Sequence, residues 1–305
     1  METHLVALSN ELAGLAARVS PSVAVVEGRP RGTASGVHWR KNLVVAAEHS
    51  IQRDEDLSLV LPDGTRVPAS LAGRDPGTDI ALLKADNLSL PVLDTAPAVE
   101  SRVGDVVLVI GRSPNSGPNA SMGIISAVSG PWRTWRGGQL EQYLRLDAAL
   151  FPGSSGGAVV DYNGRIVGMA TSALSRVAGL AIPSATINRV VDLLLEKGGV
   201  PQGYLGLSLQ PVRLPESLQK KTSAKGATAL MVYSVEPAGP AEQAGILICD
   251  ILLEIEGSGA GSIEELQAAL GWDRIGKPVR TSIIRGGELQ QKSIVVGQRK
   301  SGERK

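Results

Sequence analysis

Residues 151–169 read FPGSSGGAVVDYNGRIVGM, and this stretch decides how the surrounding chain folds. Its second half places short apolar runs on both sides of Asn163-Gly164, a dipeptide that tight β-hairpins prefer. Its first half places two adjacent serines between glycines. Because the hairpin follows directly, this loop is tied into a sheet. The loop is either a plain turn or a nucleophile beside backbone N–H groups that can hold an oxyanion. Other parts of the chain must decide between the two.

Short apolar runs separated by turn residues continue through about residues 20–177. Runs such as SVAVVEG, NLVVAA and VGDVVLVIG are rich in valine and bounded by Gly, Pro, Asp and Asn, which is typical of β-strands. Because no helical pattern interrupts them, they predict an all-β barrel or sandwich. The segment ATINRVVDLLLEKGG follows Ser184, a good N-cap, and ends at two glycines, so a helix is expected to close this unit.

A second unit follows a short linker at 200–203. Strand-like segments YLGLSLQPV, ALMVYSV, ILLEIEG, PVRTSIIRGG and QKSIVVG, with the helical SIEELQAAL, predict a complete small α/β domain. The expected class is therefore mainly β. The expected organisation is an N-terminal helical segment at 1–19, a first domain at 20–199, a second at 203–297 and a flexible charged tail at 298–305.

Composition narrows the function classes. The net charge of +1 gives no electrostatic reason to propose nucleic acid or an anionic membrane as a partner. The single cysteine, Cys249, excludes an intramolecular disulfide, and its apolar surroundings predict a buried thiol. Three scattered histidines and one cysteine cannot build a zinc site alone, so no metal or other cofactor is expected.

The N-terminus suggests a location. METHLVALSNELAGLAARVSPSV lacks a basic region followed by an apolar one, and its leucines repeat at three- and four-residue spacing, as in an amphipathic helix. No stretch reaches the ~18 apolar residues of a membrane span. The chain as written is therefore expected in the cytoplasm, or in the periplasm if its N-terminus is trimmed.

Few residues can serve as a general base. Of the histidines, His4 lies near the terminus and His38 lies inside a strand, whereas His49 ends the run NLVVAAEH, where a rigid strand presents its ring. A histidine acting on serine needs a carboxylate to orient it. Asp79, in DPGTDIALLKA, lies between a turn and an apolar strand. It is either that orienting carboxylate or a turn-capping residue.

The order His49, Asp79, Ser155 resembles that of HtrA-type trypsin-like serine proteases with one C-terminal PDZ domain. The resemblance covers about residues 20–297 and is carried by VVAAEH, GTDIALLK, FPGSSGGAVVDYNGRIVGM and GLAIPS, and in the second unit by YLGL and GPAEQAG. It implies a two-β-barrel protease domain followed by an α/β PDZ domain. The chain departs from the pattern at Ala34-Ser35-Gly36, where the family usually has Gly-Ser-Gly.

The resemblance also implies a role for individual residues. Ser155 would be the nucleophile, His49 the general base and acid, and Asp79 the orienting group. The oxyanion hole would be formed at Gly153 and Ser155, with Ser154 between them. The S1 pocket would be framed by Leu150, Ala173 and Leu174. These side chains carry no charge, so an aliphatic P1 residue is expected.

In the second unit, the resemblance makes Tyr204, Leu205, Gly206 and Leu207 the loop and strand that receive a peptide C-terminus, with Leu266 beside the peptide. The implied function is an ATP-independent endopeptidase of protein quality control and stress response, acting on unfolded or misfolded proteins. The PDZ domain would recruit substrate or regulate cleavage. A homo-oligomer, by family a trimer, is implied. The alternative is a proteolytically silent peptide-binding or chaperone-like scaffold.

Overall fold

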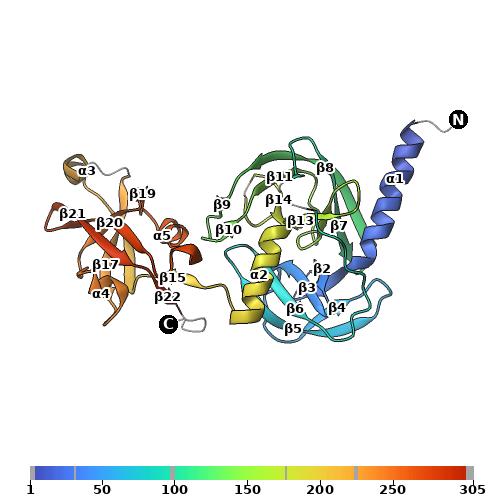
Figure 1. The fold of residues 1–305 in the computed structure, drawn as a ribbon, viewed down its shortest axis with the longest axis horizontal. Coiled ribbons are helices and arrows are strands. Elements are labelled where there is room, and N and C mark those ends of the chain that lie inside the picture. The colour runs from blue at the N-terminus through green and yellow to red at the C-terminus, as the bar shows by residue number, and fades with distance from the viewer. Residues whose placement is uncertain (1–3, 31, 97–99, 176, 223–225, 300–305) are drawn as a thin grey trace. The chain divides into compact units, whose positions relative to one another are not determined.

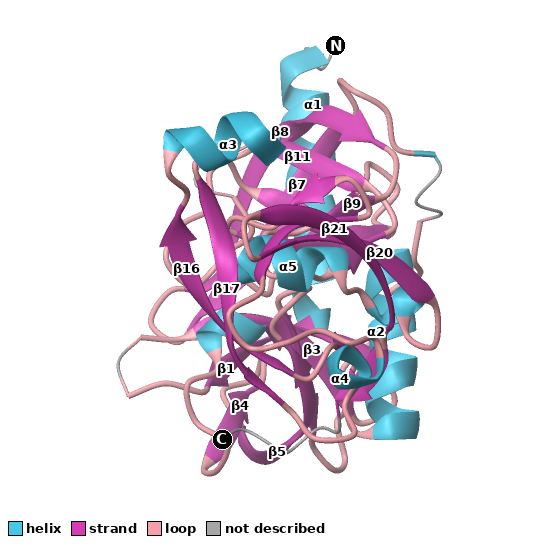
Figure 2. Ribbon diagram, turned by 90° about the vertical axis from the view of Figure 1, so that its left-hand side faces the viewer, coloured by secondary structure: helices cyan, strands magenta, loops and turns pink. Residues whose placement is uncertain are grey.

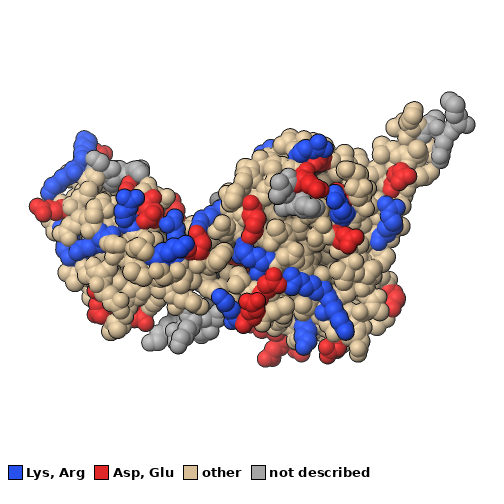
Figure 3. All heavy atoms as spheres, in the orientation of Figure 1, with Lys and Arg blue, Asp and Glu red and all other residues tan. Residues whose placement is uncertain are grey.

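The computed structural model describes residues 4–30, 32–96, 100–175, 177–222 and 226–299. They fall into two compact units. The first contains the residues up to Trp132 and Gln139–Gly199, and the second contains Arg133–Gly138 and the residues from Val200 onward. Each unit has its own core, and Figure 3 shows acidic and basic side chains interspersed on the visible face of each. The mainly β class expected from the sequence is confirmed.

The first barrel closes from six strands in the order β1-β2-β3-β6-β5-β4 (Figure 1). Its core is made of small and branched apolar side chains such as Val26, Val44, Leu59 and Leu83, all fully buried. The strands are β1 (Val23–Glu27), β2 (Ala34–Arg40), β3 (Leu43–Ala47), β4 (Leu57–Val60), β5 (Arg66–Asp75) and β6 (Ile80–Lys84).

The second barrel closes in the order β11-β14-β13-β12-β7-β8. Its strands are β7 (Val106–Ser113), β8 (Gly117–Ser129), β11 (Tyr143–Asp147), β12 (Ala158–Val160), β13 (Ile166–Thr171) and β14 (Leu180–Pro183). The hairpin expected around Asn163-Gly164 joins β12 to β13, with Ala158 opposite Met169. Outside the barrel, β9 (Trp132–Arg133) pairs with β10 (Gln139–Leu140).

Two long helices belong to the first unit. In α1 (His4–Val19), Leu15 and Val19 are buried. Helix α2 (Ser184–Lys197) ends at Gly198, which adopts the left-handed conformation that favours glycine. Ser184, expected as the N-cap, is instead the first helical residue, and its hydroxyl donates to the Ala96 carbonyl over 3.0 Å. Short 3-10 turns are η1 (Ser20–Ser22) and η2 (Glu48–Ser50).

The second unit is built on a sheet in the order β16-β17-β18-β20-β21, with β19 beside β18 and a separate pair β15–β22. The strands are β15 (Gln202–Tyr204), β16 (Leu207–Arg213), β17 (Thr228–Val235), β18 (Ile251–Ile255), β19 (Ser258–Gly259), β20 (Pro278–Arg285), β21 (Glu288–Val295) and β22 (Gly297–Arg299). The helices are α3 (Glu216–Thr222), α4 (Pro240–Gln243), α5 (Ile263–Ala269) and the 3-10 turn η4 (Trp272–Arg274). Figure 2 shows α3 at the ends of β16 and β17.

The prediction of a buried Cys249 is wrong, since its side chain is exposed. The residue lies in a tight turn, in which the Leu247 N–H donates to the Asp250 carboxylate and the Cys249 N–H donates to the Val232 carbonyl. Its φ of 71° places it in the left-handed region. The apolar neighbours on which the prediction relied, Leu247 and Ile248, are themselves exposed.

Candidate active site

The ends of two paired strands bring His49 and Asp79 together. Ala47, the last residue of β3, lies opposite Ile80, the first residue of β6. His49 Nδ1 lies 2.9 and 3.0 Å from the two carboxylate oxygens of Asp79. The backbone N–H of His49 also donates to Asp79 Oδ1, over 2.9 Å. These contacts hold the imidazole with Nδ1 toward the carboxylate, so Nε2 is directed to the other side.

Thr171 is a further partner of Asp79. Its hydroxyl donates to Asp79 Oδ2 over 2.5 Å, and in turn accepts the Ala173 N–H over 3.1 Å. Asp79 is fully buried, so its carboxylate depends on these donors to replace water. Sequence reasoning missed Thr171, because a threonine at the end of an apolar strand carries no local sign of a partner 92 residues away.

Ser155 reaches the same site from the second barrel. Its hydroxyl lies 3.2 Å from the hydroxyl of Ser172, the residue that follows β13. Across the described ranges, no hydrogen bond joins Ser155 to His49. The histidine and the aspartate are therefore assembled, while the serine hydroxyl has a different partner. Catalytic hydrogen bonds often form only when substrate binds.

Three N–H groups of the loop before β12 donate to backbone carbonyls. The Ser154 N–H donates to the Phe151 carbonyl (2.9 Å), and the Gly157 N–H donates to the Ser154 carbonyl (2.9 Å). The Gly156 N–H donates to the Ala170 carbonyl, also over 2.9 Å. Within the described part of the chain, the N–H groups of Gly153 and Ser155 donate to no carbonyl. Both N–H groups are open to an oxyanion, whereas that of Ser154 is engaged.

Two glycines allow this loop conformation. Gly153 has a φ of 90° and Gly156 a φ of 86°, both in the left-handed region. A Cβ on Gly156 would lie 2.0 Å from the Ser35 carbonyl oxygen, so no larger residue fits there. The loop thus needs glycine for its backbone angles and for the close approach of the first barrel.

The residues expected to frame S1 lie along the same edge of the second barrel. Leu150 is half-buried, and a Cβ on Gly179 would lie 2.7 Å from its Cδ1, so the two pack closely. Ala173 is half-buried, while Leu174 is 2% exposed and offers little surface to a substrate. The available wall is therefore apolar and uncharged.

The expected peptide site of the second unit lies at a sheet edge. Among the described strands, β16 pairs with β17 alone, so its other edge is available to an added strand. In the segment before it, Gly206 has a φ of 76°, and the N–H groups of Leu205 and Gly206 donate to no backbone carbonyl among the described residues. Leu266 on α5 and Leu205 share one core cluster and are nearly fully buried. Tyr204 ends β15, opposite Gly297.

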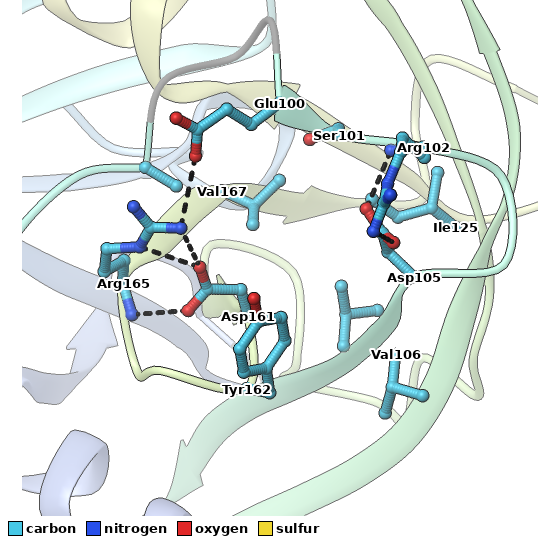
Figure 4. A pocket seen from close by; sticks show the side chains of 12 residues that line it. Glu100, Ser101, Arg102, Asp105, Val106, Ile125, Asp161, Tyr162, Arg165 and Val167 are labelled. Atoms are coloured by element: carbon cyan, nitrogen blue, oxygen red, sulfur yellow. Dashed lines mark hydrogen bonds and ion pairs between the residues drawn. The ribbon is translucent and has the colours of Figure 1, made fainter.

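A separate pocket of about 400 Å³ lies on the second barrel (Figure 4). Its lining contains none of the residues above. Arg165 pairs with Asp161 and Glu100, and Arg102 pairs with Asp105. Because each arginine is already paired with a carboxylate, an anionic ligand would have to displace one of these carboxylates from its arginine.

Comparison with known families matches both units. Residues 34–169 match the trypsin-like peptidase domain, and residues 203–296 match the PDZ domain. A probable periplasmic DegP-like serine endoprotease of Bartonella henselae is 34% identical over 253 residues, covering 80% of this chain and 49% of the relative. A probable periplasmic serine protease of the do/HhoA-like type from Haemophilus influenzae is 32% identical. The match covers 85% of this chain and 56% of the relative. The chain thus spans about half the length of these relatives.

Solved structures agree with this result. The serine endoprotease from Yersinia pestis is 30% identical with a TM-score of 0.65, covering 94% of this chain and 97% of that one. The HtrA-type protease AlgW, solved with a decapeptide, is 27% identical with a TM-score of 0.68, covering 94% and 98%. The likeness therefore includes both units and not the barrels alone.

The comparisons correct one expectation from the sequence. A cytoplasmic location is contradicted, because the relatives from Bartonella and Haemophilus are named as periplasmic proteases. The residue pattern of the first segment was a weak guide to location. None of the described helices is long and apolar enough to cross a membrane.

Proposed function

This chain belongs to the HtrA- and DegP-like serine endoproteases, and on that premise we propose that it is an ATP-independent endopeptidase that degrades unfolded or misfolded proteins. The observation that carries the proposal is the contact of His49 Nδ1 with the buried carboxylate of Asp79, at 2.9 Å. That contact places an oriented imidazole at the junction of the barrels, where the Ser155 loop also lies.

Ser155 is the nucleophile in this proposal. Its hydroxyl turns from Ser172 to His49, which takes the proton as the oxygen attacks the scissile carbonyl, and then gives it to the leaving amine. The N–H groups of Gly153 and Ser155 bind the oxyanion of the tetrahedral intermediate. Water then releases the acyl group by the same steps. Asp79 keeps the imidazole oriented and stabilises its charged form.

Leu150 and Ala173 form the surface that meets the P1 side chain, with Leu174 behind them. An apolar wall favours a small or medium aliphatic side chain, because a lysine or arginine would lose its hydration without gaining a carboxylate. We therefore expect cleavage after residues such as valine, alanine or leucine.

The second unit binds the C-terminus of a peptide. The N–H groups of Leu205 and Gly206 receive the carboxylate, and the peptide adds as a strand to the edge of β16. Tyr204 and Leu207 flank this loop, and Leu266 limits the depth available to the last side chain. Such binding recruits substrate or regulates cleavage. The family supports a homo-oligomer, which we propose to be a trimer.

Digestion of unfolded casein tests the proposal. The wild type should cleave it without ATP, whereas Ser155→Ala should not, and sites mapped by mass spectrometry should follow aliphatic residues. Equal digestion by both proteins would refute the mechanism, and cleavage mainly after Lys or Arg would refute the S1 assignment. A fluorophosphonate that failed to label folded wild type, even with peptide present, would favour the silent scaffold.

A further inference from the structure

Ser35 on β2 makes two hydrogen bonds to the nucleophile loop and one to strand β7. Its hydroxyl donates to the Gly153 carbonyl over 2.7 Å and accepts the Arg112 N–H of β7 over 2.9 Å. Its own N–H donates to the Ser155 carbonyl over 3.1 Å. The residue is fully buried, so these partners replace water completely. One side chain thus joins the first barrel, the second barrel and the loop.

The bonded carbonyls occupy particular places in the loop. The Gly153 carbonyl belongs to the peptide group between Gly153 and Ser154, which lies between the two N–H groups open to an oxyanion. Because a peptide group is planar, holding its carbonyl also sets the direction of the Ser154 N–H, which donates to Phe151. The Ser155 carbonyl lies directly after the second open N–H group. Ser35 therefore holds the backbone on both sides of Ser154.

We propose that Ser35 is a positioning residue for the oxyanion hole. Its hydroxyl keeps the Gly153–Ser154 peptide in the orientation that lets the Gly153 and Ser155 N–H groups converge on one point. This inference rests on the proposed function, since an oxyanion forms only if Ser155 attacks a carbonyl. It assigns a function to the serine of Ala34-Ser35-Gly36, a motif to which the triad chemistry gives no role.

Catalysis provides the first test, with Ser35→Ala as the variant. An oxyanion hole acts on the transition state, so kcat should fall by about 10- to 100-fold while KM changes little. The substrate is a chromogenic peptide with an aliphatic P1 residue. A peptide trifluoromethyl ketone, which mimics the tetrahedral intermediate, should bind more weakly by a similar factor.

Ser22→Ala is the matched control. Ser22 is also a fully buried serine of the first unit, but its hydroxyl has no hydrogen-bond partner among the described residues. This variant removes the same atom without touching the loop, so its kcat and its affinity for the ketone should stay at the wild-type level. If Ser35→Ala matched Ser22→Ala within twofold in both measurements, the proposal would be overturned.

Ser35→Cys keeps an atom at the γ position and carries the test if Ser35→Ala does not fold. Its thiol is a weak donor and acceptor, so we expect kcat to fall by about 3- to 10-fold with KM unchanged. A kcat equal to that of the wild type would overturn the proposal.

Hydrogen exchange separates failure of this inference from failure of the proposed function. It is measured by mass spectrometry on peptides covering 151–157 and needs no activity. Faster exchange in the Ser35 variants, but not in Ser22→Ala, supports the positioning of the loop even if the wild type does not cleave casein. Unchanged exchange together with unchanged kcat in an active enzyme would refute the positioning role of Ser35 and leave the proposed function standing.

Discussion

At the scale of single residues, the two adjacent serines of the loop differ in their contacts. Ser154 is buried, its hydroxyl donates to Asn119 Oδ1 over 3.3 Å, and its N–H is used inside the loop. Among the described residues, the Ser155 hydroxyl has one hydrogen-bond partner, the hydroxyl of Ser172, at 3.2 Å. Such a bond can be exchanged at little cost, which suits a nucleophile that must turn to His49.

Ser172→Ala should raise the reactivity of Ser155. A hydrogen bond between neutral groups contributes about 0.5–1.5 kcal/mol, so removing this one should speed labelling of Ser155 by a fluorophosphonate about 2- to 10-fold. Labelling rates are measured without peptide. Ser175→Ala, in the same loop but with no hydrogen bond to Ser155 among the described residues, should react like the wild type. A slower or unchanged rate in Ser172→Ala would show that Ser172 does not hold Ser155 away from His49.

At the scale of elements, the turn between β5 and β6 positions Asp79 through a second aspartate. Asp75 is buried at the end of β5, where it accepts the Thr78 hydroxyl at 2.6 Å and the Gly77 N–H at 3.2 Å. These bonds close the turn from which Asp79 emerges with a φ of 60°. Burial raises the pKa of Asp75 above its ordinary value despite both bonds.

Asp75→Asn should therefore stabilise the first unit at neutral pH. A carboxyl whose pKa is raised in the folded state costs stability once it ionises, so the wild type loses stability as pH rises from the unfolded-state pKa through the folded one. The neutral amide removes that loss. Thermal unfolding at pH 5 and pH 7.5 should show a smaller fall in Tm for Asp75→Asn than for the wild type.

Asp63→Asn is the control for this comparison. Hydrogen bonds from Thr65 lower the pKa of Asp63, so its ionised form is favoured in the fold. Removing that charge should not raise the Tm at neutral pH. A Tm of Asp75→Asn that followed pH as steeply as that of the wild type would contradict the assignment of the buried charge.

At the scale of the whole molecule, the second unit has a core of its own. It also contains a partly buried ion pair between Asp250 and Arg285. Asp250 is 1% exposed, and the Arg285 guanidinium donates to both of its carboxylate oxygens, at 2.8 and 2.7 Å. Burial would raise the pKa of Asp250, but Arg285, the Leu247 N–H and Lys292 together hold it below its ordinary value. The stability that this pair contributes is present above the unfolded-state pKa of Asp250. It is lost as pH falls through the lowered pKa of the folded state.

Arg285→Met should destabilise the second unit and leave the first unchanged. Removing one partner strands a buried carboxylate and costs about 3 kcal/mol. Hydrogen exchange of the full chain should become faster in peptides from 207–296 and stay the same in the two barrels. Arg280→Met replaces an exposed arginine on the same strand and should have little effect. Faster exchange in the barrels as well would show that the units do not unfold separately.

Local sequence patterns were sufficient for the class of both units. Alternating apolar runs and turn dipeptides report on neighbouring residues only, which is enough to predict strands, the hairpin after Ser155 and the helix that ends at Gly198. The same local reasoning failed at Cys249, because apolar neighbours indicate burial only where the backbone turns them inward. The sequence also carried no sign that the Ser154 N–H, which lies between the two proposed oxyanion donors, is engaged within the loop.

By itself, the sequence determined the two-unit β architecture, the family and the three residues proposed for catalysis, since each lies in a short motif that can be read without the fold. Only the tertiary structure decided what those residues touch. The bonds from Ser35 to Gly153 and from Thr171 to Asp79 join residues 118 and 92 positions apart. Such contacts exist only after both barrels have closed and met, so no local pattern can specify them.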